Sequence, residues 1–446
     1  MRSDSTFRRN LLGIALPVTL QSLMQSSFSL IDQVMIGQMG ADSIAGIGLG
    51  GKFASMYSVV VSAVAAAAGI MAAQYIGQDN ERQFAKSFYR NLVFALMVAA
   101  VFTALGTLFP HEIMFLYTDD NAAGAVAADY LRIYALSFMP VAVSAVASVI
   151  LRCIDSAVIP LVVSFLSVIM NTCLNYLLIF EKFGCPALGV SGAAIASVIA
   201  QTTAFMLTVG FFIVILHRKH MRMPFGIRFA AQEGSMYFGI LAPILICEFM
   251  WSLGENAYAA IYGHLGTDEC AAMTMTGPIQ GLMIGALSGL AQAAGIMVGK
   301  SLGNEEYDKA YNDSKMLMWY GFLGSVMLSA LLVMFGRYYT AVYRVEPEVQ
   351  VLSYQILIAF ALISPVKVQN MILGGGIIRS GGMTKYVMWI DMIGTWLFGV
   401  PLGLLAAFVW KLPIPYVYFI LSLEETVRLL ISIVIFRGKK WMRSLA

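Results

Sequence analysis

The amino-acid sequence predicts an all-α membrane protein with twelve transmembrane helices in two six-helix repeats. The first observation is composition: of the 446 residues, 59% are hydrophobic and 12% are charged, and the mean hydropathy is +0.78. A water-soluble core cannot bury that much apolar surface, so the expected solvent is lipid. The second is a series of apolar stretches of membrane-spanning length, too long for the short alternating strands of a membrane β-barrel. The third is an internal repeat.

The internal repeat relates two segments of the chain at a constant offset of 226 positions. Residues 13–77 align without a gap on 239–303, and 18 of the 65 aligned positions are identical. Pro17 recurs as Pro243, and the pentapeptide Ala-Ala-Gly-Ile-Met occurs in both segments. Two halves that share one apolar pattern are typical of transporters built from repeats, whose binding sites lie between or within the repeats.

Twelve apolar stretches predict the helices in chain order. They cover 10–36, 47–75, 87–109, 131–151, 158–180 and 190–216 in the first half, and 235–262, 275–298, 315–335, 351–374, 386–409 and 414–436 in the second. The basic segment 217–234 separates the halves. We therefore predict an N-lobe at 1–216 (helices one to six), a cytoplasmic linker at 217–234 and a C-lobe at 235–446 (helices seven to twelve). Because each half crosses the membrane an even number of times, an axis along the membrane normal should relate the repeats.

The distribution of Lys and Arg predicts the orientation. With a cytoplasmic N-terminus, 20 of the 28 Lys and Arg residues fall in cytoplasmic segments, and only Lys182, Arg337, Arg344 and Lys411 fall in outside loops. This asymmetry predicts a multi-pass protein of the cell membrane with both termini in the cytoplasm. The net charge of +3 reflects this topology, and no nucleic-acid partner is expected.

Four polar residues of the first predicted helix share one face. Gln21, Gln25, Ser29 and Asp32 follow one another at spacings of four, four and three residues. A carboxylate within the membrane costs about 2.5–3.5 kcal/mol on insertion scales, so Asp32 needs an explanation. Two interpretations stay open. Asp32 is either an interfacial carboxylate with access to water, or it lines a wet cavity and binds a proton or a small cation.

Two further polar pairs occur in the first half. Asn171 and Asn175 are one turn apart on the fifth helix, and Ser197 and Gln201 are one turn apart on the sixth. They either join helices by hydrogen bonds or, together with Asp32, form an all-oxygen cluster.

The second half carries its own charges inside predicted helices. Glu248 and Glu255 share a face of the seventh helix, and Lys367 lies within the tenth. A buried Glu–Lys pair is either structural or part of a second ion or substrate site. In the twelfth helix, the spacing of Glu424, Glu425 and Arg428 predicts a local ion pair.

The sequence contains no pattern for catalysis or nucleotide binding. There is no HExxH, no GxxxxGK(S/T), no GxSxG and no cluster of His, and the five cysteines form no CxxC pair. We expect no enzyme, no cofactor and no metal site other than Na⁺ at Asp32. Since ATP cannot drive this chain directly, the energy for transport should come from an ion gradient.

Several segments of the chain match one known family. They are Leu16–Pro17, Asp32–Gly37, Gly40–Ala41, Asn171–Phe180, Ala187–Ala194, Ala242–Pro243, Gly376–Gly382 and Glu424–Trp441. On these segments the chain resembles the multidrug and toxic compound extrusion (MATE) transporters over essentially its whole length. The resemblance implies a V-shaped pair of six-helix lobes. It also implies antiport of organic cations or other toxic amphiphiles against protons or sodium.

The resemblance also carries residue roles. Asp32 stands where many members have the Asp that binds the coupling ion, and Gln25 and Asn171 match polar positions of the family's N-lobe site. Asn175 stands where several members have a second Asp, which favours protons slightly over sodium here. We expect ion coupling at Asp32, Asn171 and Asn175. We expect the substrate cavity to include Gln25, Ser29, Gln201, Glu248 and Glu255.

The resemblance does not supply a role for the glutamates of the seventh helix. Some members carry a Glu in that helix and an Asp in the tenth, where this chain has Trp251 and, within one residue, Val366. The expected role of Glu248 and Glu255 is therefore an inference from this sequence alone.

The expected function is secondary active export by alternating access. The expected partners are organic cations or amphiphiles and membrane lipids, and we expect a monomer. A lipid-linked oligosaccharide flippase and a dedicated metabolite exporter remain as alternatives. A receptor or scaffold is disfavoured because the sequence has no long segment outside the membrane for a sensing domain.

Overall fold

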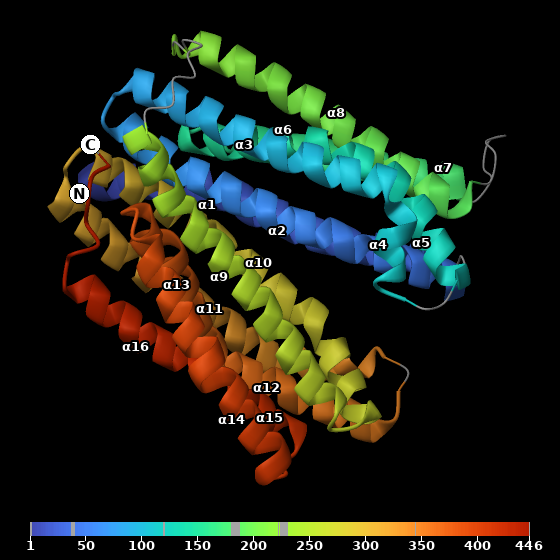
Figure 1. Ribbon diagram of the computed structural model, residues 1–446. Helices are drawn as coiled ribbons and strands as arrows, with labels where there is room; N and C mark the ends of the chain where they lie inside the picture. Colours follow the sequence, from blue (N-terminus) through green and yellow to red (C-terminus); the bar gives the residue numbers. More distant parts are fainter. Residues whose placement is uncertain are drawn as a thin grey trace. The chain divides into compact units, whose positions relative to one another are not determined.

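The computed structural model describes residues 2–36, 41–118, 121–179, 188–221, 223, 231–343 and 345–445, and every regular element in these ranges is helical (Figure 1). Helices α1 to α8 cover Arg2–Ile36, Ala41–Gly77, Glu81–Leu108, Pro110–Phe115, Asn121–Tyr134, Phe138–Cys153, Val158–Ile179 and Gly189–Arg218, with the 3₁₀ turn η1 at Ala135–Ser137. Helices α9 to α16 cover Ala231–Gly263, Thr267–Gly303, Tyr307–Ala341, Pro347–Asn370, Thr384–Met392, Val400–Leu404, Ile414–Ser422 and Glu424–Arg437. The π-helical segments η3, η4 and η5 cover Met371–Ile378, Ile393–Gly399 and Leu405–Val409.

The prediction of an all-α fold is confirmed, and within the described residues the twelve apolar stretches are helical except at Phe109 and Leu423. Ten helices or continuous helical runs among the described residues are long and apolar enough to cross a membrane. Helix α1 and the pair α15–α16 occupy the remaining two stretches. The sequence did not predict the short helix α4 or the three π-helical segments, because both depend on local packing more than on apolar periodicity.

The twelfth stretch is divided at Leu423. The backbone N–H of Leu423 donates to the carbonyl oxygen of Ile420, and the N–H of Thr426 donates to that of Leu423, so the chain tightens by i to i+3 bonds at this point. Helix α16 then begins with Glu424 and Glu425. Negative side chains are favourable in the first turn of a helix, where backbone N–H groups are unsatisfied. The division therefore places two carboxylates at a new helix start.

The chain forms two compact units. The C-terminal unit comprises Met1–Ser22, Ala73–Gln78 and Phe229–Ala446, and the N-terminal unit comprises Leu23–Ala72 and Asp79–Arg228. Helices α1 and α2 thus contribute residues to both units. The two units group residues by their contacts in space and not by their order in the chain. The division into lobes at 1–216 and 235–446 remains a prediction.

The core of the N-terminal unit is built on small residues of α2 and on a group of aromatic rings. Helix α3 packs along α6, and α7 packs along α8 (Figure 1). A Cβ on Gly69 would lie 2.7 Å from Cγ1 of Val149, so α2 and α6 approach closely only because Gly69 has no side chain. Tyr57 is buried, and its hydroxyl donates to the carbonyl oxygen of Phe138 at 2.5 Å.

The core of the C-terminal unit lies among α9, α10, α12 and α15. Its fully buried side chains include Ile356 and Phe360 of α12 and Val417 of α15. The π-helical segment η3 follows α12 and packs on α10. A Cβ on Gly376 of η3 would lie 2.6 Å from the carbonyl oxygen of Ala291, so this approach also requires glycine.

Candidate functional site

Three polar residues of the N-terminal unit are joined by hydrogen bonds. Nδ2 of Asn171 donates to Oγ of Ser197 at 3.2 Å, and Nδ2 of Asn175 donates to Oδ1 of Asn171 at 3.1 Å. Asn175 is buried, and Asn171 is half-buried. The bonds connect α7 to α8, so these side chains do join helices. Whether they also bind an ion together with Asp32 stays a prediction.

The other predicted residues of this unit lie on α1 and α8. Gln25 is exposed on α1, and Gln201 is half-buried on α8, one turn beyond Ser197. Ser29 and Asp32 belong to α1, but their side chains lie outside the described residues.

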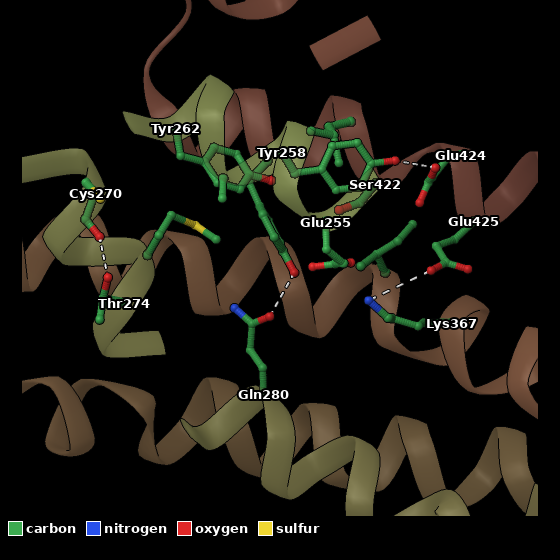
Figure 2. A pocket seen from close by; sticks show the side chains of 15 residues that line it. Glu255, Tyr258, Tyr262, Cys270, Thr274, Gln280, Lys367, Ser422, Glu424 and Glu425 are labelled. Atoms are coloured by element: carbon green, nitrogen blue, oxygen red, sulfur yellow. Dashed lines mark hydrogen bonds and ion pairs between the residues drawn. The ribbon is translucent and has the colours of Figure 1, made fainter. Parts of the chain in front are cut away.

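A pocket of about 300 Å³ opens in the C-terminal unit, and Figure 2 shows its lining. Helices α9, α10, α12, α15 and α16 contribute the residues. The lining comprises Glu255, Tyr258, Ala259, Tyr262, Cys270, Met273, Thr274, Gln280, Ile363, Lys367, Tyr418, Leu421, Ser422, Glu424 and Glu425. Glu255 is the predicted substrate residue that lines this pocket.

Glu425, which lines the pocket, has several partners. Its Oε1 lies 3.8 Å from Nζ of Lys367, and its Oε2 accepts a hydrogen bond of 2.8 Å from Nδ2 of Asn370 (Figure 2 marks the Lys367 pair). Arg428 lies 4.0 Å from the same Oε2. Lys367 of α12 therefore does form an ion pair, but with a residue of α16 and not with the glutamates of α9.

Glu424 also has several partners. Its Oε1 lies 3.3 Å from Nη2 of Arg428, which confirms the ion pair predicted from the sequence, and its Oε2 accepts a 2.5 Å hydrogen bond from the hydroxyl of Tyr258. Arg428 is buried, and it also pairs with Asp391 at 3.6 Å and donates to Thr395. The pair is thus part of a buried network and not a surface contact.

Glu255 is the carboxylate of the pocket that stays available. It is exposed on α9, and among the described residues it has no hydrogen-bond or ion-pair partner. It lies close enough to Lys367 and Tyr418 to interact electrostatically with both. Of the three carboxylates that line the pocket, Glu424 and Glu425 are paired with Arg428 and Lys367, and Glu255 is not.

Three tyrosines and a methionine form the remaining wall of the pocket. Tyr258 and Tyr262 line it (Figure 2), together with Tyr418 and Met273. The hydroxyl of Tyr418 donates to Oε1 of Gln280 at 3.0 Å. Aromatic faces attract cations through the ring quadrupole, and Met adapts to varied apolar shapes. A site with one free carboxylate and several tyrosines suits an organic cation.

Glu248 takes part in a different arrangement of the same unit. Its Oε1 lies 3.3 Å from Nη1 of Arg379, and Nη2 of Arg379 donates to Sγ of Cys247 at 3.2 Å. Sγ of Cys247 donates in turn to Oδ2 of Asp391 at 2.8 Å. Glu248 is not among the residues that line the pocket.

Some residues of the site were missed at the level of sequence. Tyr258 follows Glu255 by three residues, so helical periodicity could have placed it on the same face. Gln280 is a polar residue inside a predicted helix and could have been noted in the same way. The pairing of Arg379 with Glu248 joins segments more than 130 residues apart, and no local pattern could have found it.

Comparison with known proteins agrees with the resemblance seen in the sequence. The family model MatE matches residues 17–177 and 243–405. A probable multidrug resistance protein NorM of Neisseria meningitidis is 23% identical over 408 residues, 90% of this chain and 87% of that protein. The multidrug resistance protein MdtK of Yersinia enterocolitica is 22% identical over 406 residues, 89% of this chain and 87% of that protein.

Solved structures share the fold. A MATE protein in complex with MaL6 superposes with a TM-score of 0.87 at 15% identity, covering 97% of this chain and 96% of that one. An outward-facing multidrug resistance MATE family transporter superposes with a TM-score of 0.88 at 15% identity, covering 97% of this chain and 95% of that one. With its two apolar halves both matched by the family model, this multi-pass membrane protein belongs to the MatE family, the multidrug and toxic compound extrusion transporters.

Proposed function

We propose that the protein is a secondary active exporter that antiports organic cations or cationic amphiphiles against protons or sodium by alternating access. The observation that carries the proposal is the pocket of the C-terminal unit, in which Glu255 is the unpaired carboxylate among tyrosines. The relatives are named multidrug resistance proteins, which supports a role in drug export.

The pocket has the chemistry to bind a cation. Glu255 supplies the counter-charge, and the rings of Tyr258, Tyr262 and Tyr418 supply cation–π attraction of about 0.5–2 kcal/mol each, depending on desolvation. A volume of about 300 Å³ is at the lower end for ligand sites. It therefore fits a small organic cation, or the cationic end of a larger amphiphile.

An ion gradient is the proposed source of energy, since the sequence has no nucleotide-binding loop. We assign ion binding to Asp32 with Asn171 and Asn175. Binding of the ion from outside favours release of the substrate, and loss of the ion to the cytoplasm restores affinity for a new one. Such coupling requires that ion and substrate have different affinities for the two states.

Replacing Glu255 with Gln should weaken binding of ethidium, an aromatic organic cation, about tenfold, which corresponds to ~1.4 kcal/mol. The substitution keeps the side-chain size and removes the unpaired charge. Ethidium fluorescence titrated with the purified protein measures the affinity. Glu348→Gln, which neutralises an exposed carboxylate of α12 outside the pocket, is the matched control. Equal affinities of Glu255→Gln and wild type would remove Glu255 from the substrate site.

Export itself is tested in cells that lack their own cation exporters. Cells that produce this protein should accumulate less ethidium than cells with an empty vector, and the difference should vanish when the membrane gradients are collapsed. A lipid-linked oligosaccharide flippase or a dedicated metabolite exporter would give no such difference.

A further inference from the structure

The ends of α2 and α10 cross at positions that the internal repeat relates to each other. A Cβ on Gly77 would overlap the carbonyl oxygen of Lys300, and a Cβ on Gly303 would overlap the carbonyl oxygen of Gln74. Gly77 aligns with Gly303 and Gln74 with Lys300 at the repeat offset of 226. The two helix backbones therefore touch in a nearly symmetric way, with each glycine lying against the other helix.

The contact extends one turn back along both helices. A Cβ on Gly299 would lie 2.9 Å from Cβ of Ala73. Both helices thus present two small residues four positions apart, the pattern that lets membrane helices approach closely. All of these residues belong to the C-terminal unit, because Ala73–Gln78 is the segment of α2 that packs with it.

A buried glutamine at this crossing, Gln74, also forms hydrogen bonds with Arg443 and Leu445. Gln74 is fully buried, and its Nε2 donates to the carbonyl oxygens of Ser380 at 2.6 Å and Arg443 at 3.2 Å. Its Oε1 accepts from the backbone N–H of Leu445 at 2.7 Å. Two of the three bonds of this side chain are therefore made to Arg443 and Leu445.

We call residues 441–445 the C-terminal strap, and these residues make specific contacts with the rest of the unit. Trp441 is fully buried, stacks on Phe436 at 5.6 Å, and donates from Nε1 to the carbonyl oxygen of Phe436 at 3.0 Å. A Cβ on Gly381 would overlap the carbonyl oxygen of Trp441, so the strap lies directly on this backbone. Gln78, one turn beyond Gln74, donates to Oγ of Ser444 at 3.0 Å.

The polar nature of Gln74 makes the crossing depend on the strap. Packing between the small residues of α2 and α10 needs no amide at this position, and an apolar side chain would hold the contact alone. A buried amide, in contrast, is stable only while its partners are present, because an unsatisfied buried donor or acceptor keeps its full desolvation cost. If the strap leaves, Nε2 of Gln74 keeps its bond to Ser380, but Oε1 loses its partner and must draw water into the crossing.

We infer that the C-terminal strap is a latch, which holds the α2–α10 crossing closed when it is docked and allows it to open when it leaves. Helix α2 passes from one compact unit to the other just before residue 73. The latch therefore fixes the end of a helix that both units share. The inference rests on the proposed alternating-access function for its purpose, in which opening of the crossing would be one step of the cycle.

Hydrogen exchange of the purified full-length protein tests the latch without any transport assay. Truncation after Met442 removes both strap partners of Gln74 but keeps the Trp441 anchor. It should speed exchange of the amides at 299–303 at least tenfold. In the Gln74→Leu background the same truncation should change this exchange less than threefold, because the crossing no longer needs the strap. In the Gln78→Leu background the tenfold effect should persist.

Three results would overturn the latch. The first is unchanged exchange at 299–303 after truncation of the wild type. The second is an equal acceleration in the wild type and in Gln74→Leu, which would mean that the strap does not act through Gln74. An acceleration spread over all helices would indicate general loss of folding and would also overturn it. Failure of the wild type to export ethidium would overturn the proposed function and leave the exchange result standing.

Discussion

Asp32→Asn should abolish ion-coupled export while the protein remains expressed and folded. Asparagine has nearly the same size as aspartate, but it carries no charge and cannot take up a proton in the physiological range. If Asp32 is the group that binds the coupling ion, no other carboxylate of the predicted first-half cluster can replace it, since Asn171 and Asn175 are amides. Gradient-dependent ethidium efflux should fall to the level of cells with an empty vector.

The matched control for this substitution is Asp129→Asn. Asp129 is exposed on α5 of the same unit, and its neutralisation should leave export unchanged. Equal protein levels in the membrane must accompany the comparison. Normal export by Asp32→Asn would refute the assignment of the coupling ion to this residue.

Arg428→Leu should destabilise the protein by about 3–5 kcal/mol, the usual cost of removing one partner from a buried ionic network. Arg428 is 7% exposed and faces three carboxylates, Glu424, Glu425 and Asp391. Without the guanidinium, these buried charges lose their common partner, and repulsion between neighbouring carboxylates adds to the cost. Thermal unfolding of the purified protein in detergent should show a clearly lower midpoint.

The control compares a buried pair with an exposed one. Lys309 and Glu306 form an exposed ion pair at 2.6 Å on the N-terminal side of α11. Lys309→Met should cost no more than about 1 kcal/mol, because solvent screens such pairs. If Arg428→Leu unfolds at the same temperature as Lys309→Met, the network around Arg428 does not hold the C-terminal unit together.

The fold could be predicted from the sequence because lipid imposes simple rules. A helix that crosses a membrane must be long, apolar and internally hydrogen-bonded, so the twelve stretches were visible in composition alone. The ion pair between Glu424 and Arg428 was also visible, because it lies within one helix. The division at Leu423 was not, since it depends on i to i+3 bonds that leave no apolar signal.

The pocket could be predicted only in part. Glu255 was found because a charge inside an apolar stretch is unusual. Its surroundings were not, because Lys367, Tyr418 and Glu425 come from three other helices. The repeat shows that Gly77 and Gly303 correspond. It does not predict that α2 and α10 contact each other at these two glycines, because that contact depends on how the helices pack.

The central claim is that an ion gradient drives organic cations through this protein. The most direct measurement uses proteoliposomes that contain only the purified wild type, with ethidium on one side and either a proton or a sodium gradient imposed. We predict ethidium movement opposite to the ion flow under one of the gradients, absent in protein-free vesicles and lost when an ionophore collapses that gradient. Ethidium movement that does not exceed that of protein-free vesicles under either gradient, from protein that still binds ethidium, would contradict the claim.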